Sequence, residues 1–220
     1  MTQTRYANRD DAAGQLADAV AALALPKPLV MGIPRGGVPM AACVAERLGA
    51  PLDVVLVHKL RAPGNPEYAL GAVDESGRVA LRADAGYEET DPAIQAEIRR
   101  EVQTLKDRRR RYATPALDPA GHDVVIVDDG AATGATVEAA VAVMRRTAAA
   151  SITVALGVAP PEVVWRLRQA ADTVICPLTP EDFMAVGQFY GVFDQVNDET
   201  VATLLRAGTT ANAKPDSPAV

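Results

Sequence analysis

Residues 124–136 constrain the fold and function of this chain more than any other segment. Four consecutive apolar residues, 124–127, predict a buried strand of a parallel sheet, with Asp128 and Asp129 at its carboxyl end. A turn of small residues follows, and Thr136 opens a predicted helix. Backbone N–H groups at a helix N-terminus favour an anion, and carboxylates accept hydrogen bonds from hydroxyl groups. The segment therefore predicts a site for a phosphorylated sugar.

Apolar strands alternate with amphipathic helices along most of the chain. Strands are predicted at 29–31, 52–57, 124–127, 151–158 and 173–176, and helices at 10–25, 38–48, 91–112, 136–144 and 161–171. This alternation predicts an α/β fold, a parallel central sheet with helices on both faces. Ligands of such sheets bind beyond the carboxyl ends of the strands, where the loops after Met31, Val57 and Val127 are expected.

The remaining segments predict one domain, residues 1–207. Its core is expected at about 28–176, with a small hood from the C-terminal segment 177–207, the 69–81 segment, or both. The Pro- and Gly-rich residues 59–68 predict a mobile loop, and 69–81 a hairpin that turns at 75–77. A last helix is expected from Asp198 through Leu205, and 208–220 are expected to be a disordered tail.

Composition narrows the function classes. The net charge of −6 argues against a general nucleic-acid or membrane-surface role, and no apolar stretch is long enough to span a bilayer. The two cysteines, Cys43 and Cys176, stand in or beside apolar runs, which is typical of reduced, buried thiols. The polar N-terminus has no signal-peptide pattern. A cytoplasmic protein is expected.

The 124–136 segment resembles the phosphoribosyl pyrophosphate (PRPP) motif of type I phosphoribosyltransferases. The shared pattern is an apolar run, two acids, and then Thr133-Gly134-x-Thr136. The resemblance implies that 131–136 hold the 5′-phosphate and that the two acids hold the ribose hydroxyls. The implied PRPP-binding residues are Asp128, Asp129, Ala131, Ala132, Thr133, Gly134, Ala135 and Thr136. PRPP synthetases and non-catalytic PRPP sensors share this motif.

Two earlier elements extend the resemblance. Pro34, Arg35, Gly36 and Gly37 resemble the pyrophosphate-binding loop of the family, which often carries a non-proline cis peptide. Lys59 stands where the family commonly places a basic residue for the departing pyrophosphate. The implied catalytic residues are Lys59 and the two acids of the PRPP motif. His58 replaces a commoner arginine and is interpreted as a polar residue at a strand end.

The acceptor is less well defined. Phe183, Tyr190 and Phe193 are concentrated in a chain with few aromatic residues. They could pack the C-terminal segment on the core, form a hood over a nucleobase, or do both. Ala132 occupies the position where 6-oxopurine enzymes have an aspartate that contacts the base, which argues against a hypoxanthine or guanine enzyme of that mechanism. The basic run 108–111 predicts solvated charge or a dimer contact.

The resemblance implies a Mg²⁺-dependent transferase that moves the phosphoribosyl group of PRPP to a nitrogen acceptor and releases pyrophosphate. The metal is expected to be held largely by substrate and water, with few protein ligands, and Asp128 and Asp129 are candidates to reach it through water. The alternatives are a non-catalytic PRPP or nucleotide sensor and an enzyme that hydrolyses pyrophosphate from PRPP. A homodimer is common in the family. The chain is also similar to uncharacterised bacterial phosphoribosyltransferase-like proteins, which share residues 62–67 and 179–183.

Overall fold

A five-stranded parallel sheet forms the centre of the computed structural model, which describes residues 5–211. The strand order is β2-β1-β6-β7-β8, and every neighbouring pair is parallel. The predicted α/β fold with a parallel central sheet is confirmed. The strands are β1 (Pro28–Gly32), β2 (Leu52–Val54), β6 (Asp123–Asp128), β7 (Ser151–Leu156) and β8 (Thr173–Ile175).

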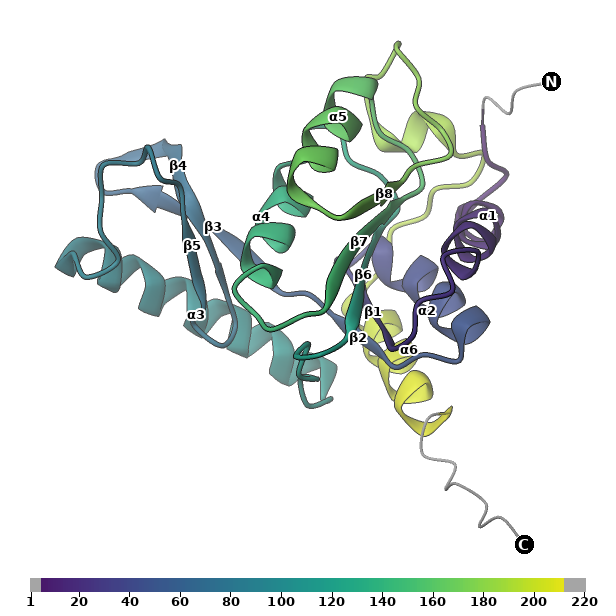
Figure 1. Ribbon diagram of the computed structural model, residues 1–220, viewed down its shortest axis with the longest axis horizontal. Coiled ribbons are helices and arrows are strands. Elements are labelled where there is room, and N and C mark those ends of the chain that lie inside the picture. The colour runs from purple at the N-terminus through teal and green to yellow at the C-terminus, as the bar shows by residue number, and fades with distance from the viewer. Residues whose placement is uncertain (1–4, 212–220) are drawn as a thin grey trace, which may run out of the picture.

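Helices cover both faces of this sheet (Figure 1). Val30 and Val125 pack with α1 and α2 on one face, and the alternate residues Leu29 and Val124 pack with α4 and α5 on the other. The apolar runs of the strands are buried because neither face meets water. The helices are α1 (Arg9–Ala21), α2 (Gly37–Leu48), α4 (Ala135–Met144), α5 (Pro161–Ala170) and α6 (Asp198–Ala211), the last against α2.

A second, antiparallel sheet stands beside the core, at the left of Figure 1. Its strands, in the order β3-β4-β5, are β3 (Val57–Ala62), β4 (Asn65–Asp74) and β5 (Val79–Leu81). The long helix α3 (Pro92–Tyr112) packs on one face through a separate core that includes Leu60, Leu70 and Ile94. We call residues 57–112 the α3 lobe. The predicted hairpin around residues 75–77 is confirmed.

The prediction of a loop over residues 59–68 was wrong, because most of them lie in β3 and β4. Only Pro63 and Gly64 separate the two strands, and Gly64 has a φ of 76°. Exposed Lys59 and Arg61 alternate with buried Leu60 and Ala62, a period of two that the Pro- and Gly-rich composition obscured. The predicted strand 52–57 is likewise divided between β2 and β3, which belong to different sheets.

The ends of two helices also differ from the prediction. The first helix ends at Ala21 rather than at residue 25. The last helix continues to Ala211, so residues 208–211 are helical rather than part of a disordered tail, and residues 212–220 lie outside the described residues. The irregular segment after β8 contains one short 3-10 helix, η1 (Val186–Phe189). Within residues 5–211 we find no helix with the length and hydropathy needed to cross a membrane.

Candidate active site at the carboxyl end of the parallel sheet

The loop after β1 lies directly against the end of β6. A Cβ atom on Gly36 would collide with the carboxylate of Asp129, and one on Gly37 would collide with the carbonyl oxygen of Val127. Glycine is therefore required at both positions by the close approach of the two backbone segments. The peptide bond between Pro34 and Arg35 is cis, as the family resemblance implied.

The two acids of the motif occupy different environments. Asp128 is partly exposed, and its Oδ1 accepts a hydrogen bond of 2.9 Å from the backbone N–H of Asp129. Asp129 is buried, and its Oδ2 lies 2.9 Å from Nε and 2.8 Å from Nη2 of Arg9. Burial raises the pKa of both carboxyls, and the charge of Asp129 raises the pKa of Asp128 further, while Arg9 acts in the opposite direction. Arg9 thus offsets the burial of this acidic pair only in part.

Arg9, on the N-terminal helix α1, contacts both Asp129 and the C-terminal segment. Its guanidinium lies 3.9 Å from the ring centroid of Phe193 and donates a 2.7 Å hydrogen bond to the carbonyl of Asp194. Tyr190 donates its hydroxyl proton to the carbonyl of Asp129 at 2.5 Å. Sequence reasoning missed Arg9, because it lies 120 residues from its partner and belongs to no local motif.

The loop between β6 and α4 has the features of an anion site. Gly134 precedes the helix with a φ of 74° and has no side chain to cap it, and the N–H of Ala135 makes only a long 3.5 Å hydrogen bond to the hydroxyl oxygen of Thr133. Ala132, Thr133 and Thr136 are exposed. A helix N-terminus with so weak a cap offers N–H groups and the positive end of the helix dipole to a phosphate. The N–H of Ala131 is an exception, because it donates to the carbonyl of Val158 at 2.9 Å.

Arg166 of α5 forms hydrogen bonds with this loop and with α4. Its Nη2 donates a 2.6 Å hydrogen bond to the carbonyl of Thr133, and its Nε donates a 2.9 Å bond to Glu138 on α4. Sequence reasoning did not identify Arg166, since the helical pattern of α5 gives no sign that one of its side chains reaches the neighbouring loop.

A cavity of about 490 Å³ separates the α3 lobe from the core. Pro34, Lys59 and Thr136 all line it, so the structure brings together residues from three segments that the sequence identified separately. Gly36 and Gly37, in the same loop as Pro34, pack directly against Asp129 and Asp128. Further lining residues are His58, Arg61, Glu101 and Arg108. The cavity wall is therefore rich in positive charge.

The three aromatic residues predicted to form a hood lie in different environments. Tyr190 is buried, with its ring centroid 5.4 Å from that of Tyr6 and 5.0 Å from that of Phe193. Phe183 is partly buried and packs on Phe189 at 5.1 Å. Phe193 is partly exposed beside Arg9. These contacts fix the C-terminal segment to the core, and the hood over a base stays a prediction.

Comparison with known proteins agrees with this geometry. The family model described as the phosphoribosyl transferase domain matches residues 5–190, which include Arg9, the two loops and Tyr190. The chain belongs to the phosphoribosyl transferase domain family. The match starts and ends outside the 28–176 region in which the sequence motifs lie, so it includes the N-terminal helix that pairs with the acidic motif.

Two relatives illustrate the similarity. A protein of Mycobacterium tuberculosis that is provisionally named a phosphoribosyl transferase is 41% identical over 204 residues, which cover 91% of this chain and 46% of the relative. The chain thus spans about half the length of the curated relatives it matches. The crystal structure of the protein TT1426 from Thermus thermophilus has a TM-score of 0.85 and 45% identity, and the match covers 91% of this chain and 97% of that one.

Proposed function

We propose that this domain is a PRPP-dependent phosphoribosyltransferase that transfers the phosphoribosyl group to a nitrogen acceptor and releases pyrophosphate. The observation that carries the proposal is the convergence of Pro34, Lys59 and Thr136 on one cavity. The loop that contains Pro34 also packs against Asp128 and Asp129 through Gly37 and Gly36. A ligand with a phosphate, a diol and a diphosphate matches these groups in number and chemistry.

Each part of PRPP has a counterpart in the site. Residues 132–136, of which Ala132, Thr133 and Thr136 are exposed, would hold the 5′-phosphate at the start of α4. Asp128, and the Oδ1 of Asp129 that Arg9 does not bond, would accept hydrogen bonds from the ribose hydroxyls. Residues 34–37 and Lys59 would hold the pyrophosphate. The N–H of Ala131 would contribute less to the phosphate site than its neighbours, because it already has a backbone partner.

The residues present fit Mg²⁺. Asp128 and Asp129 supply the oxygen atoms that Mg²⁺ prefers, and two adjacent acids with raised pKa values favour a nearby cation. Within residues 5–211, no group of three or more His, Cys, Asp or Glu side chains could hold a metal by itself. Substrate oxygens and water would therefore complete its coordination. When bound, Mg²⁺ would neutralise charge on the diphosphate.

The protein would contribute chiefly positioning and electrostatic stabilisation. Lys59 lines the cavity as a cation for the negative charge that develops on the leaving pyrophosphate. Asp128 would orient the ribose and stabilise positive charge at its anomeric carbon. The loop braced by Arg166 would fix the 5′-phosphate, so that the reacting carbon is held relative to both groups.

Pyrophosphate release from PRPP and Mg²⁺ against a panel of purines, pyrimidines and small amides tests this proposal. At least one base should give base-dependent release. Lys59→Gln should lower that rate by about 10²-fold or more, the effect typical of removing one group that stabilises transition-state charge. Lys106→Gln, an exposed lysine on α3 outside the cavity, is the matched control and should retain the rate. PRPP binding without turnover for any base would instead identify a sensor.

A further inference from the structure

The cavity contains a histidine–carboxylate pair. Nδ1 of His58, on β3, lies 2.6 Å from Oε2 of Glu101, on α3. The other oxygen of Glu101 accepts hydrogen bonds from Nε and Nη2 of Arg100 at 3.2 and 3.0 Å. The His58 side chain is 34% exposed, and both members of the pair line the cavity wall. Glu101 therefore fixes the imidazole of His58 in the α3 lobe, facing the proposed pyrophosphate position.

The charged groups around His58 favour a highly anionic ligand. Lys59 and Arg61 come from its own strand, and Arg108 comes from α3 with its Nε bonded to the Tyr112 hydroxyl at 2.9 Å. The α4 residues that line the cavity, Thr136 and Ala139, are uncharged. Among the described residues that line this cavity, Glu101 is the only carboxylate.

Glu101 is suited to orient the imidazole of His58. Burial raises the pKa of its carboxyl, but the hydrogen bonds from His58 and Arg100 outweigh burial, and the pKa lies below its ordinary value. The ionised carboxylate accepts the N–H of Nδ1, which directs the other ring nitrogen, Nε2, away from the pair. Nε2 then belongs to a ring that lines the same cavity as Pro34 and Lys59.

We propose that His58, positioned by Glu101, donates a proton to the pyrophosphate as it leaves; this inference rests on the proposed function. The bond between the anomeric carbon and the diphosphate oxygen breaks, and its electron pair stays on that oxygen. The proton moves from Nε2 of His58 to a pyrophosphate oxygen, and water returns a proton to the imidazole after product release. The acceptor is not the partner of His58, because a nucleophile attacks opposite the leaving group.

Proton NMR of the imidazole signals tests this directly, since the chain has only two histidines. The His58 ring signals are recorded in the full chain with and without Mg²⁺ and inorganic pyrophosphate. Pyrophosphate should shift these signals, and Glu101→Gln should reduce that shift. The signals of His122, whose Nδ1 lies 3.2 Å from the carbonyl of Ala120 in a distant turn, should not shift.

A kinetic measurement adds a second readout. His58→Gln should lower pyrophosphate release from PRPP by about 10²–10⁴-fold, the range of general acid catalysis, and should remove the loss of rate at high pH. His122→Gln should leave both unchanged. Bound pyrophosphate that does not shift the ring signals of His58 would overturn the inference, as would a protein that binds PRPP but not pyrophosphate. Failure to bind PRPP at all would instead overturn the proposed function.

Discussion

Arg109 is predicted to be the side chain that most strongly attaches the α3 lobe to the core. From the last turn of α3, its Nη1 donates to Asp53 on β2 at 2.5 Å, and its Nε donates to Glu75 in the β4–β5 turn at 2.8 Å. Its Nη2 donates to the carbonyl of Val54 at 3.2 Å. Burial lowers the pKa of Arg109, but Glu75 and Asp53 outweigh it and raise the pKa above its usual value. One guanidinium therefore joins three elements.

Arg109→Met should destabilise the protein by about 3–5 kcal/mol, the cost of removing one partner from a buried ion pair. Most of this loss should come from Asp53, because its carboxylate is only 2% exposed and would stay buried without its cationic partner. Glu75 can turn toward water. The double variant Arg109→Met with Asp53→Asn should recover much of the loss, since the uncompensated charge is then absent.

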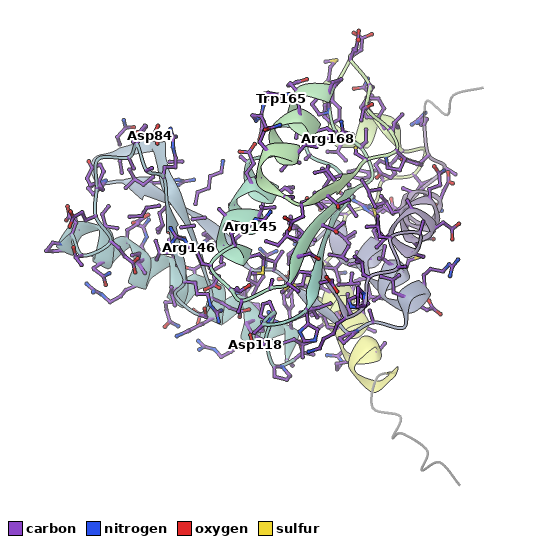
Figure 2. The ribbon with its side chains drawn as sticks, in the orientation of Figure 1. Asp84, Asp118, Arg145, Arg146, Trp165 and Arg168 are labelled. Atoms are coloured by element: carbon purple, nitrogen blue, oxygen red, sulfur yellow. The ribbon has the colours of Figure 1, made fainter. Side chains whose placement is uncertain are left out.

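Urea unfolding followed by circular dichroism measures the free energy of unfolding. The single tryptophan, Trp165, is a poor probe, because it is already 65% exposed on α5 (Figure 2). Arg111→Met is the matched control, since Arg111 is 71% exposed and lies 3.8 Å from Asp198, a pair worth about 0–1 kcal/mol. A loss no larger for Arg109→Met than for this control would refute the reasoning.

Three further predictions concern the acidic motif. Asp128→Asn should raise the free energy of unfolding at neutral pH. The pKa of Asp128 is raised in the folded protein, so the folded protein loses stability as rising pH ionises this acid. An amide cannot ionise, so the variant does not lose that stability. Unfolding curves should show this gain vanish below the ordinary carboxyl pKa of about 3.9. Gly36→Ala should cost about 1–3 kcal/mol and weaken PRPP binding by calorimetry, because its Cβ meets the Asp129 carboxylate. Tyr190→Phe should cost about 1–3 kcal/mol by leaving the Asp129 carbonyl without its bond; an unchanged melting curve would contradict this.

The parts of the site that lie within one short segment were predictable from sequence. The 124–136 segment has its strand, acids, turn and helix next to one another, so its structure follows from local pattern. The same holds for the loop after β1 and for the helix start at Asp91 and Pro92. The parallel sheet followed from the alternation of strands and helices.

Contacts between distant segments were not predictable. Arg9, Arg166 and Glu101 reach the site through the packing of whole helices, and one sequence carries no signal for such pairs. The β3 strand and the start of β4 were missed because Pro63 and Gly64 make a turn so short that the residues on either side of it were interpreted as part of a loop. For the same reason the sequence did not indicate that Glu101 of α3 is the carboxylate partner of His58.

Calorimetric titration with PRPP, with and without Mg²⁺, tests the central claim that these loops form one PRPP site. The protein should bind PRPP in a Mg²⁺-dependent manner. Asp128→Asn with Asp129→Asn should weaken PRPP binding. A charge-assisted hydrogen bond contributes about 1.5–3 kcal/mol, so each bond lost should lower the affinity by about 10–100-fold. Asp118→Asn, at an exposed acid outside the site (Figure 2), is the control and should bind normally. No Mg²⁺-dependent binding, or equal binding by the double variant, would contradict the account.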